Sequence, residues 1–221
     1  MIDCRCVKKI TDKQKGKMKK ELSKAALYRL CGILRVLEEF SKDGIINISS
    51  GELGVTLDET AYSIRKDISF LDNVISGKKG YLIRNLIQEI KNKLNLNDRK
   101  KASIVGLGRI GTAILNYSGF EEGGYDIVVG FDSSTNKIET MKTNIELYPS
   151  YEIEDVVKMK KIELGIIAVP AEFAQEIANR LVNSGVKGII NFAPVIIKAN
   201  GVYIKNIDLI TEFNFLSAVI K

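Results

Sequence analysis

The 221-residue chain is long enough for two modest domains or one large one, and its 45% hydrophobic share is ample for packed cores. No apolar run approaches the ~18–20 residues that a membrane-spanning helix needs, and the basic N-terminus lacks the apolar stretch of a signal peptide, so we expect a cytoplasmic protein. The chain contains no histidine, the commonest acid–base group of enzymes, and its three cysteines are too few for a disulfide framework.

The net charge of +6 comes from the first 20 residues, which hold eight lysines and arginines against Asp3 and Asp12. The remainder of the chain is balanced in charge. We predict that residues 1–20 form a flexible basic arm, which is either a solvated extension or a source of sequence-independent attraction to phosphate backbones. Cys4 and Cys6 lie in this arm, and the sequence leaves open whether they have a metal or redox role.

The next segment is predicted to begin with a helix that runs from Ser23, its N-cap, to about Lys42. The predicted buried face consists of residues at spacings of three and four, namely Leu27, Leu30, Cys31, Leu34, Leu37 and Phe40. Cys31 is therefore interpreted as a small core residue.

A short strand over 45–48 and two further helices over 51–55 and 60–71 are predicted to follow. The capping-box sequence Ser49-Ser50-Gly51-Glu52 opens the first of these helices. In the other helix three apolar residues are spaced to face inward: Ile64, Ile68 and Leu71. A hairpin over 73–81 and an amphipathic helix over 82–96 complete this half of the chain.

This order of elements is that of a winged helix-turn-helix, in which the third helix lies in the DNA major groove and the wing follows the adjacent backbone. The alternative is an ordinary small helical domain with a charged surface. The predicted DNA contacts are polar and basic side chains of the capping box, the third helix and the wing: Ser50, Ser63, Arg65, Lys66, Ser69, Lys78 and Lys79.

A G-x-G-x-x-G pattern at Gly106, Gly108 and Gly111 follows the apolar run Ala102–Val105, which is typical of a buried parallel strand. The first glycine makes a tight turn, the second lets a pyrophosphate approach the backbone, and the third lets a helix pack closely on the strand. A helix over 112–117 would then direct its free N–H groups and its dipole at the phosphates. Strand, glycine turn and helix in this order predict a dinucleotide site, although such glycines can also serve packing alone.

A second strand over 127–131 ends in Asp132, the acidic residue about 20 positions on that binds the 2′-OH of an adenosine ribose. Residues 133–136 contain no Arg or Lys that could neutralise a 2′-phosphate. We therefore expect the site to prefer NAD(H) to NADP(H).

Strands and helices alternate in the rest of the chain, as βαβ units require. The predicted strands cover 145–148, 163–169, 186–191 and 203–206, and the predicted helices cover 151–158, 172–184 and 208–220. The helix over 172–184 is amphipathic through Phe173, Ile177, Ala178 and Leu181. Asn191-Phe192-Ala193-Pro194 follow a strand on the side where doubly wound sheets bind ligands.

The last helix carries too much apolar surface to be left in water, so we expect it to pack on a partner subunit. The predicted fold class is α/β. It comprises a winged-helix DNA-binding domain over 21–98, a Rossmann domain with a doubly wound parallel sheet over 99–207 and a dimerisation helix over 208–221.

Taken together, these residues resemble the Rex family of bacterial redox-sensing transcriptional repressors. The resemblance runs from about Ser23 to the C-terminus. Its most specific segments are Ile64–Ser69, Val105–Gly111, Phe131-Asp132, Ala168–Ala171, Gly188–Val195 and Asn206–Leu209.

The resemblance implies a homodimer that binds palindromic operator DNA when NADH is scarce and releases it when NADH binds. It implies NADH and NAD⁺ as the ligands and an exchange of the C-terminal helix between subunits. The implied ligand-binding residues are Gly106, Gly108, Arg109, Ile110, Gly111, Tyr117, Asp132, Val169, Pro170 and Asp208. The resemblance further implies that Arg35, Tyr117 and Asp208 form a polar relay from the nicotinamide site to the first helix.

The wing departs from the family pattern. Residues 71–81 keep the basic character and Tyr81, but they lack the aromatic residues and several of the glycines. This departure leaves the operator sequence and the strength of DNA binding open.

Two other functions compete with the repressor. An NAD-dependent dehydrogenase would account for Tyr62 and Lys66, which match Tyr-x-x-x-Lys, but these residues precede the glycine turn and no further domain remains to hold a substrate. We therefore predict no enzyme activity, no catalytic residue and no metal site. The second competitor is a nucleotide- or CoA-binding regulatory module with weakened DNA binding.

Overall fold

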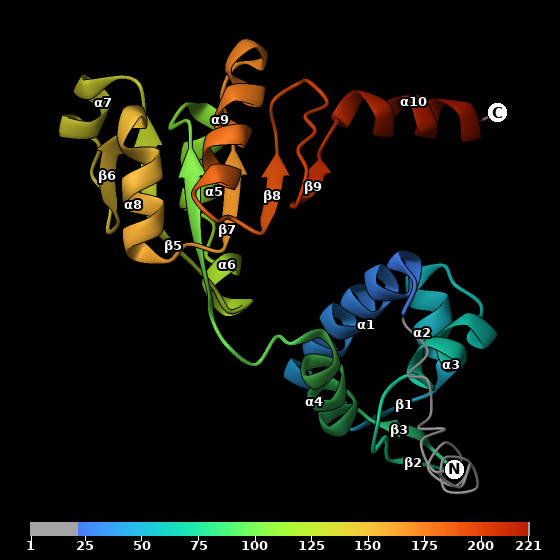
Figure 1. The fold of residues 1–221 in the computed structure, drawn as a ribbon. Coiled ribbons are helices and arrows are strands. Elements are labelled where there is room, and N and C mark those ends of the chain that lie inside the picture. The colour runs from blue at the N-terminus through green and yellow to red at the C-terminus, as the bar shows by residue number, and fades with distance from the viewer. Residues whose placement is uncertain (1–21, 221) are drawn as a thin grey trace, which may run out of the picture. The chain divides into compact units, whose positions relative to one another are not determined.

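The computed structural model describes residues 22–220, so the predicted basic arm with Cys4 and Cys6 lies outside the described residues. The chain divides into two compact units between Asn97 and Asp98, each with a hydrophobic core of its own (Figure 1).

The first unit combines helices with a small antiparallel sheet. Its elements are α1 (Lys24–Lys42), β1 (Asn47–Ile48), α2 (Ser50–Leu57), α3 (Ala61–Ile68), β2 (Ser76–Gly77), β3 (Gly80–Leu82) and α4 (Ile83–Leu94). The sheet has the order β1-β3-β2, so β1 joins the predicted hairpin as a third strand. This arrangement confirms the predicted winged helix-turn-helix.

The buried face of α1 differs from the predicted one. Leu27 is 38% exposed and Cys31 is exposed, so assigning these two residues to the core was wrong. The residues that α1 buries are Ala26, Leu30, Ile33, Leu34, Val36 and Leu37. Two overlapping rows of apolar residues fit helical spacing in α1, one with Leu27 and Cys31 and one with Ile33. The row that contains Ile33 packs in the core of the first unit.

A buried ion pair joins α3 to α1. Ile64 and Ile68 are buried as predicted, but Asp67 between them is also only 1% exposed. Arg29 donates from Nε to Asp67 Oδ2 at 2.6 Å and from Nη2 to Oδ1 at 3.1 Å. Because a buried carboxylate needs such partners, this pair fixes the rotation of α3 on the core and thereby decides which of its residues stay exposed.

The second unit is built on a parallel sheet. Its strands are β4 (Lys100–Val105), β5 (Tyr125–Asp132), β6 (Glu146–Pro149), β7 (Leu164–Ile167), β8 (Gly188–Asn191) and β9 (Tyr203–Asn206). The order across the sheet is β6-β5-β4-β7-β8-β9, and every neighbouring pair is parallel. This is the strand order of a doubly wound Rossmann sheet, which confirms the predicted fold class.

Helices pack on both faces of this sheet. They are α5 (Arg109–Leu115), α6 (Gly119–Glu122), α7 (Thr135–Thr140), α8 (Ile153–Lys160) and α9 (Ala171–Asn183), with a 3-10 turn at Ser150–Glu152. Successive strand residues point to opposite faces. Val105 and Phe131 accordingly pack with α8 and α9 on one face, whereas Ile104 and Ile166 pack with Ile114 on the other.

Several short elements differ from the predicted ones. α5 begins directly after the glycine turn at Arg109, three residues before the predicted start at Thr112. Neither α6, α7 nor the 3-10 turn was predicted. These segments are too short to display a repeating apolar pattern, because they contain four, six and three residues.

The last element, α10 (Leu209–Val219), buries none of its residues. Its exposed apolar side chains, together with the residue that follows the helix, are Leu209, Ile210, Phe213, Phe215, Leu216, Val219 and Ile220. Within residues 22–220, no helix has the length and apolar character that crossing a membrane requires.

The Arg29–Asp67 pair leads to a stability prediction. Arg29→Met should lower the free energy of unfolding by about 3 kcal/mol, because it leaves the Asp67 carboxylate buried without its partner. Glu39→Gln, which removes a charge from the exposed Arg35–Glu39 pair, should change it by less than about 1 kcal/mol. Urea unfolding of both variants measures the difference, and equal losses would mean that the buried pair does not anchor α3.

Candidate functional site

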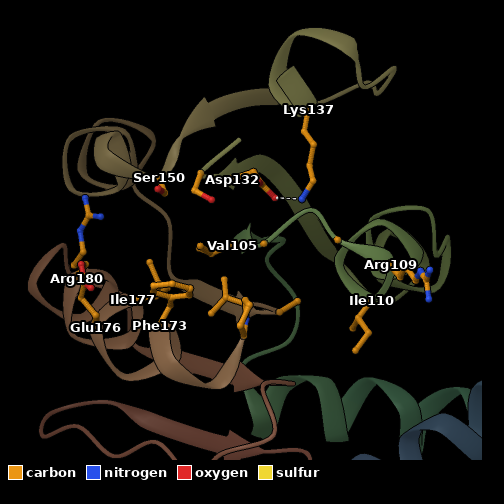
Figure 2. Close-up of a pocket in the computed structure, with 16 residues that line it drawn as sticks. Val105, Arg109, Ile110, Asp132, Lys137, Ser150, Phe173, Glu176, Ile177 and Arg180 are labelled. Carbon is orange, nitrogen blue, oxygen red and sulfur yellow. Dashed lines mark hydrogen bonds and ion pairs between the residues drawn. The ribbon is translucent and has the colours of Figure 1, made fainter. Parts of the chain in front are cut away.

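A cavity of about 770 Å³ lies over the carboxyl ends of the strands in the second unit (Figure 2). Its lining includes Val105 at the end of β4, Asp132 at the end of β5 and Ala168 directly after β7, and the strand order reverses between β4 and β7. Open α/β sheets bind their ligands at this point. Of the predicted ligand-binding residues, those that line the cavity are Gly106, Gly108, Arg109, Ile110, Asp132, Val169 and Pro170.

The three glycines of the turn differ in the space available for a side chain. Gly106 has φ +95°, and a Cβ on it would lie 2.5 Å from the Ala168 carbonyl oxygen. A Cβ on Gly111 would lie 1.9 Å from the Gly106 carbonyl oxygen. A Cβ on Gly108 would meet nothing within 4 Å, although this residue lines the cavity. Gly106 and Gly111 are therefore required by the fold, whereas Gly108 is not required by packing and borders open space of the cavity.

Asp132 lies at the end of β5 and is only 6% exposed. Its Oδ2 accepts hydrogen bonds from the Leu107 backbone N–H at 2.8 Å and from Lys137 Nζ at 3.1 Å, and its Oδ1 accepts one from the Ser134 N–H at 2.9 Å. Burial by itself raises the pKa of the Asp132 carboxyl, but these donors outweigh it and hold the pKa below its usual value. The carboxylate therefore stays ionised and can accept a hydrogen bond from a ribose hydroxyl.

Lys137 is a cavity residue that the sequence reasoning missed. The expected preference for NAD(H) rested on residues 133–136, which contain no cation, and Lys137 is the next residue. Ser134 caps α7, and this helical turn brings the Lys137 ammonium group back to the carboxylate (Figure 2). The signal was present in the sequence, because Ser134 is a good N-cap and is followed by six helical residues.

The opposite wall of the cavity is formed by α9 and the segment before it. Phe173 and Ile177 contribute apolar surface; Phe173, one of the predicted apolar residues of this amphipathic helix, is 50% exposed and lines the cavity. Arg180 donates from Nε to Glu154 Oε1 at 2.6 Å and from Nη2 to Oε2 at 2.5 Å. This bidentate pair joins α9 to α8 at the edge of the cavity.

Three predicted site residues lie elsewhere. Tyr117 is 62% exposed and packs edge-on against Phe120 at 5.7 Å, in a separate depression of about 740 Å³. Asp208 is the N-cap of α10, where its Oδ1 accepts from the Ile210 N–H at 3.0 Å and its Oδ2 from Thr211 Oγ1 at 2.7 Å. Arg35 lies in the first unit and donates to Glu39 Oε1 at 3.5 Å.

The segment after β8 has a structural role. Asn191 is fully buried, and its amide donates to the Val195 carbonyl oxygen at 2.7 Å and to Asn206 Oδ1 at 2.9 Å. It also accepts from the Ala193 N–H at 3.0 Å. These bonds hold the connection from β8 to β9 in place, and Asn191 does not line the cavity.

The candidate DNA-binding surface lies in the first unit. Arg65 and Lys66 are exposed on α3 and Ser69 is exposed at its C-cap, while Ser50 and Ser63 are half-buried. Arg65 Nη1 donates to Ser50 Oγ at 3.0 Å, which links α3 to the start of α2.

In the wing, Lys78 and Lys79 form the exposed turn between β2 and β3. Gly80 follows with φ +93°, and a Cβ there would lie 2.3 Å from the Ile48 carbonyl oxygen. The turn therefore needs this glycine in order to present its two lysines.

Comparisons with known proteins cover both units. A family described as CoA binding domain matches residues 97–195, and one described as "Putative DNA-binding protein N-terminus" matches residues 21–69. The chain is 34% identical over 202 residues to the redox-sensing transcriptional repressor Rex of Carboxydothermus hydrogenoformans, which covers 91% of this chain and 97% of that protein. It is 37% identical over 206 residues to the redox-sensing transcriptional repressor Rex 1 of Thermotoga maritima, which covers 90% and 96%.

Solved structures give the same result. RSP, a Rex-family repressor, in complex with β-NAD⁺ and operator DNA has a TM-score of 0.82 at 31% identity, over 91% of this chain and 93% of that chain. RSP in complex with β-NADH has a TM-score of 0.80 over 91% and 95%.

The lowered pKa of Asp132 leads to a prediction about acid stability. A group whose native pKa lies below its unfolded value stabilises the fold at pH above that unfolded value, and this contribution is lost as the pH falls through the native pKa. Wild type should therefore exceed Asp132→Asn in free energy of unfolding by about 1–3 kcal/mol between pH 5 and 7. Below about pH 4 the two should converge. Urea unfolding across this range measures the gap, and a gap independent of pH would contradict the assignment.

Proposed function

Because the chain belongs to the Rex family of redox-sensing transcriptional repressors, we propose that it binds operator DNA through its first unit and releases the DNA when NADH occupies its second unit. The observation that carries this proposal is the presence in one chain of a winged helix with exposed cations and a Rossmann cavity with a free space at Gly108. Neither unit alone would link the redox state of a nicotinamide to a gene.

The ligand should lie along the cavity in the orientation that Rossmann domains use. Its pyrophosphate would lie in the space beside Gly108, at the start of α5, and Asp132 would accept a hydrogen bond from the adenosine ribose. Val169 and Pro170 would contact the remainder of the dinucleotide. Tyr117 and Asp208 lie outside the cavity of the single chain, so any contact with the ligand would require a rearrangement or a second copy.

The assembly we propose is a homodimer in which the C-terminal helix is exchanged. The apolar side chains of α10 are exposed within the described chain and need a protein surface to cover them. In this assembly Arg35, Tyr117 and Asp208 would form the relay between the nicotinamide site and the first helix.

We further propose that the chain is a regulator without enzyme activity and that it acts in the cytoplasm, where DNA and the NADH pool meet. Tyr62 and Lys66, the pair that matches a dehydrogenase pattern, both belong to α3 in the first unit. The cavity is lined by residues of the second unit.

The central test measures DNA binding and NADH binding in matched variants. The purified full chain should bind a specific set of genomic DNA fragments at fixed salt. Adding NADH should release these fragments, and NAD⁺ should release them less effectively. Gly108→Val should weaken NADH binding at least tenfold and leave DNA affinity within about twofold, because the new side chain fills the ligand space only. Arg65→Ala should weaken DNA binding by about 1–3 kcal/mol and leave NADH affinity unchanged.

The controls separate binding from folding and from other ligands. Gly111→Val should fail to fold properly, because its side chain would collide with the Gly106 backbone.

Asp208→Ala should keep its affinities for DNA and for NADH, but NADH should no longer release the DNA. Repeating the DNA-release measurement with coenzyme A in place of NADH tests the competing hypothesis of a CoA-binding regulatory module. Fragments released by coenzyme A but not by NADH, or no retained fragment at all, would refute the proposed function.

Lys137 adds a prediction about the choice of ligand. The Asp132 carboxylate opposes a 2′-phosphate, and the Lys137 ammonium group partly cancels that charge. Lys137→Met should therefore widen the ratio of the NADPH and NADH dissociation constants about tenfold, equivalent to ~1.4 kcal/mol. Lys158→Met, an exposed lysine of α8 outside the cavity, should leave the ratio unchanged. Fluorescence titration gives both constants, and a ratio that narrows in Lys137→Met would show that the lysine does not offset the carboxylate.

A further inference from the structure

Tyr62 has a large aromatic side chain on the outer surface of α3. It is 69% exposed and occupies the second position of the helix after the N-cap Thr60. A single exposed aromatic residue is ordinary on a protein surface. Exposure alone therefore does not distinguish Tyr62, whereas its position within α3 does.

That position places Tyr62 in line with the exposed cations. Residues three, four and seven positions apart lie on one face of a helix, and from Tyr62 these are Arg65, Lys66 and Ser69. The opposite face is buried in the core of the first unit. Tyr62 is thus the N-terminal member of the row that α3 presents to solvent.

The N-terminal end of a recognition helix is the part that contacts base edges in the major groove. Cations such as those of Arg65 and Lys66 can bind phosphates as well as bases, and phosphate contacts position the protein without specifying sequence. A tyrosine ring at the base-contacting end offers apolar surface instead. In the major groove the one apolar group that distinguishes a base is the 5-methyl group of thymine.

The local structure holds Tyr62 in a defined place. Thr60 caps α3 by accepting a hydrogen bond from the Ser63 N–H at 3.1 Å, and the Arg29–Asp67 pair fixes the other side of the helix on α1. A tyrosine side chain has only two rotatable angles, so ordering it against DNA loses little conformational entropy. Both features favour a specific contact over a diffuse one.

We propose that the ring of Tyr62 packs against the 5-methyl group of a thymine in each operator half-site and makes Tyr62 a specificity-determining residue. This inference rests on the proposed function, because it requires α3 to enter the major groove. It assigns sequence selection at one base pair to an apolar contact and leaves attraction to the phosphates to the neighbouring cations.

Replacing thymine by uracil removes the 5-methyl group and nothing else, which gives a direct test. Fragments bound by the purified full chain define the operator, and each synthetic duplex then carries uracil at one thymine position, the same one in both half-sites. Dissociation constants are measured without NADH at fixed salt for wild type, Tyr62→Ala and Tyr62→Phe. Uracil at one position per half-site should weaken wild-type binding roughly fourfold per methyl group, as expected for one buried group of this size.

Tyr62→Ala should bind the thymine operator more weakly and should not distinguish thymine from uracil at that position. Tyr62→Phe should behave like wild type in both respects. The proposal is overturned if wild type tolerates uracil at every position, or if Tyr62→Ala keeps the preference for thymine. Equal losses in Tyr62→Phe and Tyr62→Ala would also overturn it, because the contact would then belong to the hydroxyl group.

Two controls make the outcome specific. Tyr62→Ala should bind NADH and unfold like wild type, since the side chain is exposed, and Tyr151→Ala removes a tyrosine of similar exposure, 73%, from the second unit without affecting the operator. If NADH releases the wild-type chain from DNA but uracil does not weaken its binding, the proposed role of Tyr62 is wrong and the proposed function stands. A wild-type chain that selects no fragment refutes both.

Discussion

The hydrogen bond from the Leu107 N–H to the Asp132 carboxylate is the constraint on which the nucleotide cavity depends. It joins the glycine turn after β4 to the end of β5, and a second bond, from the Gly106 N–H to the Phe131 carbonyl oxygen at 2.8 Å, lies beside it. Together they set the distance between the glycine turn and the Asp132 carboxylate, which both line the cavity. A carboxylate buried to this degree needs hydrogen-bond donors, and the turn supplies one of the three that reach Asp132, so the fold and the site share this interaction.

How much the sequence could predict depends on whether a residue acts through a periodic pattern or through a local turn. Asp132 was predictable because it ends an apolar strand at a fixed interval from the glycines, and both strand and turn are where that pattern places them. Lys137 was not found, because α7 is only six residues long and, with Ile138 as its one apolar residue, shows no apolar repeat. Its role depends on one helical turn capped by Ser134.

The first unit shows the same division. The order of its elements, and with it the winged helix, could be predicted, but the rotation of α1 could not. The apolar residues of α1 outnumber the positions that one face can bury, so helical spacing alone allowed two solutions. The Arg29–Asp67 pair was equally hidden, because a charged residue between Lys66 and Ile68 looks like part of a solvated surface. The rotation of α1 and the Arg29–Asp67 pair both depend on packing between residues far apart in the chain, which no local sequence pattern reveals.

Asp208 connects the proposed assembly to the proposed switch, and the energies involved limit what it can do alone. As the N-cap of α10, its exposed side chain makes only a modest contribution to the stability of that helix. Moving a two-state equilibrium from 1:99 to 99:1 requires a ligand to prefer one state by ~5.5 kcal/mol. A ligand that merely competed for this cap would therefore shift the populations too little. The remaining preference must come from contacts along the cavity that differ between the two states. Most of the free energy of DNA release would therefore come from ligand contacts with the space beside Gly108, with Asp132 and with α9. Asp208 would couple these contacts to α10, the helix that a second copy would cover.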